Sequence, residues 1–425
     1  MANIRSLFIT WSLSLSLFSA MALAHSSGTE GPNWVNIKAN TKEQRTALAN
    51  AGISIESVKT DSVYGTATDE ALTAIRKQGF KISETFKVSQ MVKDFPNSDS
   101  NYHNYEEMMQ ELDSIIAIQS GIFRKFSIGR TYEGRDIWAI QINTSGEFYN
   151  EGHQSAKPGI VFMGNHHARE HLSAEVPLKM LRFLAENYGS NADITRLMDT
   201  RDIFIIPMVN PDGVEYDIST GSYKMHRKNK RDNHRRNCVG VDLNRNYGYQ
   251  WGTGGSSNDV CSDVYMGPEA FSEPETQSIK AFVENRPNLK ILLSFHTFSE
   301  LILYPWGHSY DPINDQRALT AYQSMARTMA QWNGYTPQQS SDLYIASGDT
   351  TDWSWGTLGI FSFTFELSPK NSWGGGGFYP GDEIIDRVFQ DNLRPVLFLI
   401  ELADDPYRVL ENQNPLDDPN MYWLR

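Results

Sequence analysis

Histidines and acids at a His-x-x-acid spacing are the first side chains of this sequence that could bind a metal ion. The chain has 10 histidines and 51 acids in 425 residues, so chance gives roughly one such pair and the spacing alone is weak. On spacing alone, buried and hydrogen-bonded histidines remain the favoured interpretation. The pairs are His103/Glu106, His167/Glu170 and His308/Asp311.

His167/Glu170 differs from the other two pairs in its surroundings. It lies in NHHAREH, directly after the apolar segment GIVFMG, whereas the others lie in a surface-type helical pattern and in a polar turn. A catalytic zinc ion takes three neutral or anionic protein ligands and leaves a fourth position for water. His167 and Glu170 supply two ligands. His296, in the apolar segment ILLSFHT, is the best candidate for the third.

Several familiar catalytic signals are absent. The sequence contains no HExxH, GxSxG, GxxxxGK or GxGxxG, which argues against the corresponding metalloprotease, hydrolase and nucleotide sites. The glycine run 374–377 follows no strand-to-helix switch, so we expect a flexible loop there.

The composition is typical of a soluble, acidic, globular protein. Its 40% hydrophobic and 21% charged residues exclude wholesale disorder and a coiled coil. The net charge of -13 and the pI of about 5.3 argue against a general polyanion binder, so we expect no nucleic-acid partner. Two cysteines cannot form a disulfide scaffold or a Cys-rich zinc module. Beyond the first segment no apolar stretch is long enough to span a membrane.

The elements that must position these residues form an α/β pattern from about residue 94 onward. Apolar strand-like segments alternate with helical patterns, which predicts a mixed, mostly parallel twisted sheet with helices on both faces. In such sheets ligands bind beyond the carboxyl ends of the strands, where the candidate ligands stand. We further expect a hairpin turning at Glu133-Gly134, a helix capped by Ser173, and a helix over 382–404 that Pro395 kinks or splits. Residues 405–425 are predicted to be a loose C-terminal tail.

The N-terminal part divides into two segments. Residues 1–24 have a positive start, an apolar run and Ala22-Leu23-Ala24, which predicts a secretory signal peptide; the alternative is a membrane anchor. Residues 34–88 follow a βαββαβ pattern without a cluster of histidines, cysteines and acids. We interpret 25–93 as a propeptide, with an ordinary accessory domain as the alternative. Secretion or periplasmic export makes a disulfide plausible.

The NHHAREHL run resembles the zinc carboxypeptidases, the metallocarboxypeptidases of the M14 type, and most closely the carboxypeptidase T branch. The resemblance continues through PMVNPDGVEYD, KMHRKNK, VGVDLNRNYGYQWG, LLSFHTFSELILYPWG, LYIASGDTTDW and FSFTFEL. It spans about residues 94–404, the expected catalytic domain, and it implies a peptide hydrolase with one Zn²⁺ per chain. The implied substrates are peptides and proteins with a free C-terminal carboxylate, and we expect a monomer.

The resemblance also implies a role for individual residues. His167, Glu170 and His296 would bind the zinc ion. Glu366 would act as general base and later as proton donor, while Arg227 would polarise the scissile carbonyl. A carboxylate is suited to take a proton from a metal-activated water, and a guanidinium is suited to meet an oxyanion or a carboxylate. The implied contacts of the substrate's terminal carboxylate are Asn244, Arg245 and Tyr344, with Arg169 as an accessory contact.

The pocket for the last side chain of the substrate is implied to be lined by Leu303, Asp349, Thr351 and Thr364. Thr351 together with an acid at Asp349 is similar to the branch that releases both classes of residue. We therefore expect broad release of apolar, aromatic and Lys/Arg residues. Phe298 departs from relatives that often have tyrosine there, which puts one subsite hydrogen bond in doubt.

The resemblance further implies a disulfide between Cys238 and Cys261, an inhibitory propeptide cleaved near Lys93-Asp94, and structural Ca²⁺ that we cannot place. Two free thiols are the alternative to the disulfide. A cell-wall peptide amidase of the same fold is the alternative enzyme, and a non-catalytic binding module on this scaffold is the alternative outside enzymes.

Overall fold

A computed structural model of the chain describes residues 33–87, 99, 101–149, 154–219, 223–235, 237–371 and 377–411. The predicted signal peptide 1–24, the expected cleavage position Lys93-Asp94 and glycines 374–376 lie outside the described residues. In the part that the structure describes, no helix combines the length and the apolar character needed to span a membrane.

Residues 33–87 form a four-stranded sheet of their own, which we call the N-terminal module. The elements follow the predicted βαββαβ order, and the sheet order is β2-β3-β1-β4 with every neighbouring pair antiparallel. Thr41 and Thr68 cap the two helices with their side chains, which satisfies backbone N–H groups at both N-termini. The elements are β1 (Asn33–Lys38), α1 (Lys42–Asn50), β2 (Ser54–Val58), β3 (Ser62–Ala67), α2 (Asp69–Lys77) and β4 (Ile82–Lys87).

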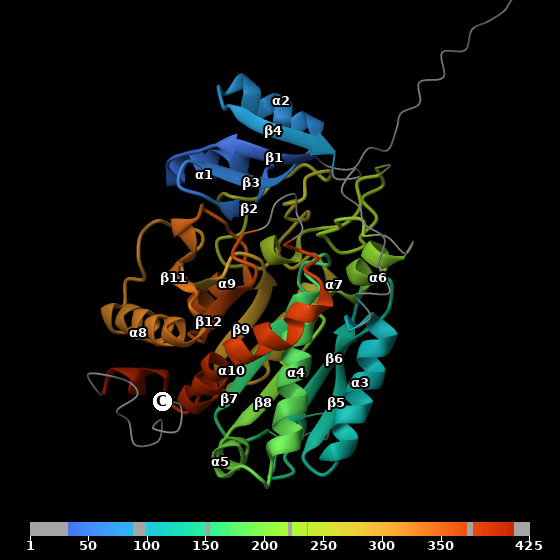
Figure 1. Cartoon of the computed structure of the whole chain (residues 1–425), viewed down its shortest axis with the longest axis vertical. Helices are drawn as coiled ribbons and strands as arrows, with labels where there is room; N and C mark the ends of the chain where they lie inside the picture. The colour runs from blue at the N-terminus through green and yellow to red at the C-terminus, as the bar shows by residue number, and fades with distance from the viewer. Residues whose placement is uncertain are drawn as a thin grey trace, which may run out of the picture. The chain divides into compact units, whose positions relative to one another are not determined.

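An eight-stranded mixed sheet forms the centre of the rest of the chain, in the order β11-β10-β12-β9-β7-β8-β6-β5 (Figure 1). The central strands β12, β9, β7 and β8 are parallel to one another. Strand β10 is antiparallel to β12 and parallel to the edge strand β11, and β8, β6 and β5 pair antiparallel toward the other edge. The strands are β5 (Phe123–Arg130), β6 (Asp136–Ile142), β7 (Gly159–Gly164), β8 (Asp202–Ile206), β9 (Leu289–Thr297), β10 (Leu301–Tyr304), β11 (Thr336–Gln339) and β12 (Phe361–Leu367).

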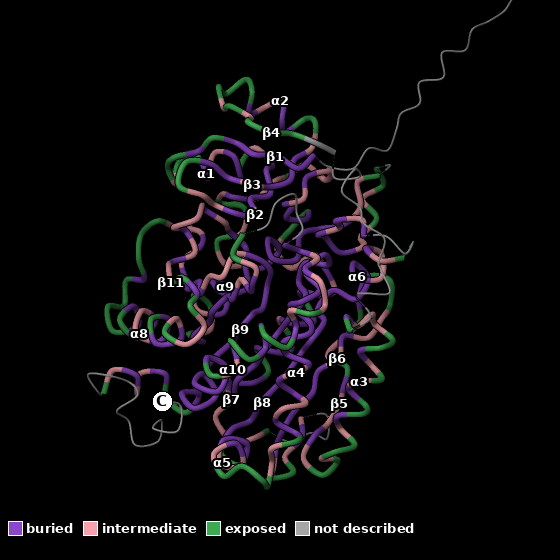
Figure 2. Tube along the Cα trace, viewed as in Figure 1, coloured by how far each residue is buried: buried purple, intermediate pink, exposed green. Residues whose placement is uncertain are grey.

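Helices cover both faces of this sheet, as the sequence predicts. Along β7, Ile160 and Phe162 enter one apolar core and Val161 and Met163 enter the other, because successive side chains of a strand point to opposite faces. Figure 2 shows the central strands buried over nearly their whole length. The first core is closed by α3 (Tyr105–Ile118), α4 (Leu172–Asn187), α5 (Ala192–Thr200), α8 (Gln316–Asn333) and α10 (Ile385–Leu402), and the second by α7 (Pro274–Glu284) and α9 (Thr350–Leu358).

The expected cap of one helix is wrong, and another helix is not split where a proline lies. Helix α4 begins at Leu172, and Ser173 lies inside its first turn rather than at its cap. The Ser173 hydroxyl instead donates to the Glu170 carbonyl at 2.6 Å and accepts from the Asn165 N–H at 3.0 Å, so it ties together the loop before the helix. Helix α10 continues through Pro395, which is buried, so the proline does not split the helix.

The chain after residue 404 is more ordered than predicted. Pro406–Leu410 forms a short 3-10 helix, in which Pro406 and Val409 are buried against α8 and α10. Residues 412–425 of the predicted tail lie outside the described part. The short strands β10 and β11 were not predicted either, although the hairpin at Glu133-Gly134 joins β5 and β6 as expected.

Candidate metal centre and active site

The candidate site lies beyond the carboxyl ends of β7, β9 and β12. His167 and Glu170 stand in the loop after β7, and His296 is the penultimate residue of β9. In the pairing of β9 with β12, His296 is directly opposite Glu366. Because Phe295 points into the first core, the alternation of the strand sends His296 to the opposite face.

The loop after β7 has a tightly defined backbone. Asn165 has a φ of 58°, and its side-chain amide donates to the carbonyls of His167 at 2.9 Å and Glu170 at 3.3 Å. A Cβ at Gly164 would lie 2.1 Å from the Ser173 carbonyl oxygen, so only glycine allows this approach. These contacts aim His167 and Glu170 toward β9.

His167, Glu170 and His296 form a set of donors suited to a divalent cation. Their ligand atoms all lie within 4.8 Å of one another, and all three residues are buried. The two Nδ1 atoms are 3.1 Å apart, while the Glu170 carboxylate lies 2.7 Å from His167 and 3.0 Å from His296. Tetrahedral ligands at zinc–nitrogen distances are separated by about 3.3 Å, so two histidines, one carboxylate and a water fit zinc. Among the described residues this is the one group of its kind, and the expected calcium remains without a location.

Each histidine is fixed from behind by a hydrogen bond of its other ring nitrogen. His167 Nε2 lies 3.1 Å from Asp242 Oδ1, and His296 Nε2 lies 3.1 Å from Ser294 Oγ. Such outer contacts set the ring orientation and leave Nδ1 free for the metal. Burial raises the pKa of Asp242, but Arg227, His167 and Arg245 together outweigh burial and hold the pKa of this carboxyl well below its ordinary value.

Arg227 and Glu366 flank the triad. Arg227 donates from Nε to Asp242 at 2.9 Å, and its Nη1 lies 3.9 Å from Glu170 Oε1. Burial, followed by the negative charges of Glu170 and Glu56, raises the pKa of Glu366 well above its ordinary value. A carboxyl group that readily holds a proton therefore stands beside a fixed positive charge and the metal donors.

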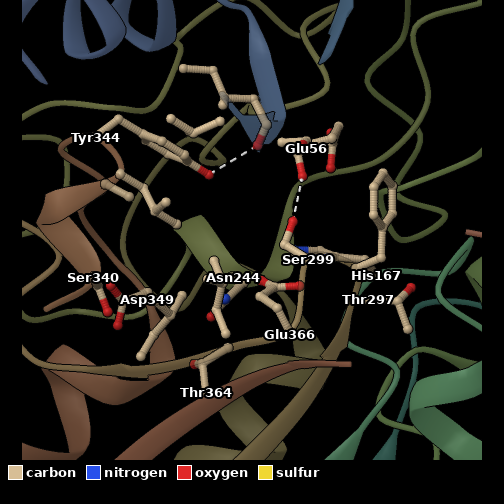
Figure 3. A pocket seen from close by; sticks show the side chains of 18 of the residues that line it. Glu56, His167, Asn244, Thr297, Ser299, Ser340, Tyr344, Asp349, Thr364 and Glu366 are labelled. Carbon is tan, nitrogen blue, oxygen red and sulfur yellow. Dashed lines mark hydrogen bonds between the residues drawn. The ribbon is translucent and has the colours of Figure 1, made fainter. Parts of the chain in front are cut away.

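Most of the predicted site residues line one cavity (Figure 3). The Asn244 side-chain oxygen accepts from the backbone N–H and the hydroxyl of Thr350 at 3.0 and 2.9 Å, which leaves the amide NH₂ group for a ligand. Arg245 is held at the wall by bonds to the carbonyls of Gly255 and Asn244. The predicted residues that line the cavity are His167, Glu170, Arg227, Asn244, Arg245, Leu303, Tyr344, Asp349, Thr364 and Glu366.

Of the predicted site residues, His296, Arg169 and Thr351 are not among those that line the cavity. Arg169 is fully buried, with its guanidinium 3.2 Å from Asp263, paired with Glu56 of the N-terminal module, and 4.4 Å from the Phe378 ring centre. Thr351 donates its hydroxyl to Asp349 Oδ1 at 2.8 Å. Its contribution to the pocket is therefore to orient Asp349.

Asp349 is both the N-cap of α9 and part of the cavity wall. It accepts from the backbone N–H of Asp352 at 2.7 Å. Burial and the neighbouring charge of Asp352 raise the pKa of Asp349 to about 7. The acid expected to receive basic substrate side chains is thus one that titrates near neutrality.

Strand β2 of the N-terminal module forms part of the wall of this cavity. Ile55, Glu56, Ser57 and Val58 are among its lining residues. The Tyr344 hydroxyl donates to the Ile55 carbonyl at 3.2 Å and Ser299 Oγ donates to the Glu56 carbonyl at 3.3 Å, as Figure 3 shows. The Glu56 carboxylate pairs with Arg169 and lies 3.7 Å from Arg227 Nη1.

A second contact of the module is apolar. Trp34 of β1 is buried against Met225, Phe298 and Phe378, which form one cluster. Phe298, where the resemblance suggested a tyrosine, uses its ring for this packing: it lies edge-on to Phe378 at 5.1 Å.

Cys238 and Cys261 form the predicted disulfide, and no free cysteine remains. The bridge brackets the segment that carries Asp242, Asn244 and Arg245. Sequence reasoning did not single out Asp242, Ser294 or Glu56. Asp242 could have been noticed, because it precedes Asn244 by two residues in the same motif, but Glu56 lies in a segment without any signal for chemistry.

Comparisons with known proteins agree with this arrangement. A family profile described as zinc carboxypeptidase matches residues 108–394. A zinc carboxypeptidase from Saccharothrix mutabilis subsp. capreolus is 35% identical over 421 residues, covering 94% of this chain and 95% of that protein. Human carboxypeptidase A1 is 32% identical over 316 residues, which is 72% of each chain. The structure of carboxypeptidase A from Helicoverpa armigera has a TM-score of 0.72 at 23% identity, over 89% of this chain and 98% of that chain, and so shares the fold.

Proposed function

Because this chain belongs to the zinc carboxypeptidase family, we propose that it is a secreted enzyme, made in an inhibited form, that removes single C-terminal residues from peptides and proteins. Membership makes it a zinc-dependent metallocarboxypeptidase; the substrate range, the residue roles and the activation are our proposals. The observation that carries them is that His167 and Glu170, which form the metal-donor group with His296, line the same cavity as Glu366 and Arg227.

The residues divide the reaction between them. Zinc, when bound, supplies Lewis-acid activation of water and of the scissile carbonyl. Glu366 takes one proton from the attacking water and returns it to the leaving amine as the C–N bond breaks. Arg227, fixed by Asp242, meets the negative charge that develops on the carbonyl oxygen.

A free terminal carboxylate is held at the other end of the cavity. Arg245 offers a guanidinium, Asn244 an amide NH₂ and Tyr344 a hydroxyl, and all three belong to the lining. Beyond them, Leu303 and Thr364 present a surface of mixed character and Asp349 presents an acid. This combination supports release of apolar, aromatic and Lys/Arg residues.

The N-terminal module supports an inhibited precursor. Strand β2 closes one side of the candidate substrate cavity, and the Tyr344 hydroxyl donates to the Ile55 carbonyl rather than being available to a carboxylate. We propose that residues 25–93 are the propeptide and that cleavage near Lys93-Asp94 allows activity. The disulfide and the predicted signal peptide support an extracellular or periplasmic site of action.

A panel of blocked peptides that differ only in the last residue tests the proposal on the trimmed enzyme. We expect release of Phe, Leu, Lys and Arg, loss of release with a chelator, and recovery with Zn²⁺. The same peptides with an amidated C-terminus serve as the control and should be cleaved poorly, because Arg245 and Asn244 then lack their partner. Equal cleavage of amidated peptides, or hydrolysis unaffected by the chelator, would contradict the proposed function.

A further inference from the structure

A buried chain of hydrogen-bonding side chains runs behind the metal donors to the wall of the cavity. His296 Nε2 lies 3.1 Å from Ser294 Oγ, which in turn lies 3.1 Å from His166 Nδ1. His166 Nε2 lies 3.3 Å from Thr350 Oγ1, and the Thr350 hydroxyl donates to the Asn244 side-chain oxygen at 2.9 Å. The chain therefore begins on a metal ligand and ends on a residue of the carboxylate-binding wall.

The middle of this chain is completely enclosed. His166, Ser294 and Thr350 are each at most 1% exposed. The His166 ring stacks on the His296 ring at 5.6 Å, and its Nε2 also lies 2.9 Å from the Tyr247 hydroxyl. Buried polar groups need hydrogen-bonding partners, so each bond in the chain constrains the next.

Metal binding fixes the direction of every bond. When His296 uses Nδ1 as a ligand, Nε2 carries the proton and donates to Ser294 Oγ. The Ser294 hydroxyl then donates to His166 Nδ1, which leaves the His166 proton on Nε2. Thr350 Oγ1 and the Tyr247 hydroxyl can accept it, so the Thr350 proton is directed at Asn244 Oδ1. The opposite direction would put a proton on His296 Nδ1 and is incompatible with a metal.

We propose that His166 is a positioning residue that links the metal ligand His296 to the substrate-binding residue Asn244. Through Ser294 it orients the imidazole that binds zinc. Through the Thr350 hydroxyl, which acts beside the Thr350 backbone N–H, it helps to keep the Asn244 oxygen turned away from the cavity and the amide NH₂ turned toward the substrate carboxylate. The inference rests on the proposed function for the role of Asn244, but its effect on metal retention does not depend on catalysis.

The test uses His166→Phe, Thr350→Val and the double variant in the trimmed, zinc-loaded enzyme. Phenylalanine preserves the stacked ring and removes both nitrogens, and valine preserves the shape of threonine. His166→Phe should release zinc to a chelator at least about tenfold faster and raise the KM for a blocked peptide about tenfold. Thr350→Val should raise KM by a similar factor with kcat nearly unchanged and zinc release unchanged, since Tyr247 still accepts from His166.

The double variant distinguishes a connected chain of hydrogen bonds from two contacts that act independently on KM. If His166 acts on Asn244 through Thr350, the KM of the double variant equals that of His166→Phe, because a broken chain loses nothing more at a second break. Thr350→Ser retains the hydroxyl and should restore the wild-type KM. Thr328→Val changes a buried threonine of α8 outside the site and should leave KM and zinc release unchanged.

The inference would be overturned if the increase in KM of the double variant equals the product of the two single increases. It would also be overturned if His166→Phe releases zinc at the wild-type rate. A wild-type enzyme without zinc-restorable hydrolysis would instead refute the proposed function. The zinc-release measurement would still decide the link between His166 and His296 in that case.

Discussion

Glu366 and Arg227 show how the surroundings of single side chains change their tendency to hold a proton. Both belong to residue types that are usually exposed, yet here Arg227 is enclosed and Glu366 faces the cavity beside the metal donors. Burial and neighbouring acids favour the protonated form of Glu366, while Asp242 and Glu56 favour the charged form of Arg227. The pair therefore offers one group that exchanges a proton and one that does not.

Replacing Glu366 with glutamine should lower kcat by about 10²–10⁴-fold, because the amide cannot take up or return a proton. KM and bound zinc should change little, since glutamine keeps the shape of the side chain. Steady-state kinetics and metal analysis measure both. Glu284→Gln, in an exposed i,i+4 pair with Lys280, is the matched control and should behave as wild type. Wild-type turnover in Glu366→Gln would remove this residue from the mechanism.

Asp349 predicts a specificity that changes with pH. Since burial and Asp352 raise its pKa to about 7, the carboxyl is neutral at pH 6 and charged at pH 8. The Arg245 guanidinium, which favours the charged form, and the Thr351 hydroxyl are the other groups that face it. The ratio of kcat/KM for Arg over Leu release should rise about tenfold across this range, as one charged hydrogen bond is gained.

In Asp349→Asn this ratio should be low and flat with pH, while release of Leu is preserved. A steep pH dependence of the ratio in that variant would assign the effect to another group.

The sequence predicted the three metal donors and most of the residues that line the cavity, but it did not predict the orientation of every side chain. His167, Glu170 and His296 carry a spacing and an apolar context that can be read directly. The fate of Thr351 cannot be read in this way: whether its hydroxyl points into the cavity or toward Asp349 depends on the capping of α9, a geometric detail.

Strands and helices were predicted where their hydrophobic period is long. Strands β7 and β9 are continuous apolar runs, and α3 has a clear amphipathic face. Strand β11, with the sequence TPQQ, has neither apolar side chains nor alternation, and only its pairing with β10 makes it a strand. The continuity of α10 through Pro395 likewise depends on tertiary packing rather than on local preference.

Strand β2 is the element on which inhibition should depend. Glu56 is its charged contact, paired with Arg169 and close to Arg227. Glu56→Gln in the uncut full-length protein should raise residual hydrolysis about tenfold or more, because a buried charge pair loses one partner. Gel analysis of the assayed sample must show that the chain is intact.

Asp61→Asn is the control for this variant. Asp61 pairs with Lys38 inside the N-terminal module and is exposed, so its change should leave the residual activity as it is. Equal activities of Glu56→Gln and wild type would show that steric occupation by β2 suffices without the charge.

The disulfide acts on the stability of the molecule as a whole. Cys238 and Cys261 close a loop with a sequence separation of 23 residues. Removing both with serine should lower the free energy of unfolding by about 3 kcal/mol. Denaturant titration of the trimmed enzyme measures the change. KM should also rise, because the loop carries Asn244 and Arg245.

Thiol titration of the unfolded wild-type protein should detect no free thiol. Two titrated thiols, or an unchanged stability of the double serine variant, would contradict a structural role for the bridge.

If the N-terminal module is an inhibitory propeptide as proposed, the packing of Trp34 would make cleavage of the chain and release of the module two separate events. Its indole packs among Met225, Phe298 and Phe378, and none of these contacts involves the backbone near residue 93. After cleavage the N-terminal module should therefore stay bound non-covalently. Activity should then appear with a delay set by the rate at which the module dissociates. Dilution should shorten that delay for molecules that are already cleaved. Dissociation of the module would then expose the Phe298 and Phe378 side chains to water.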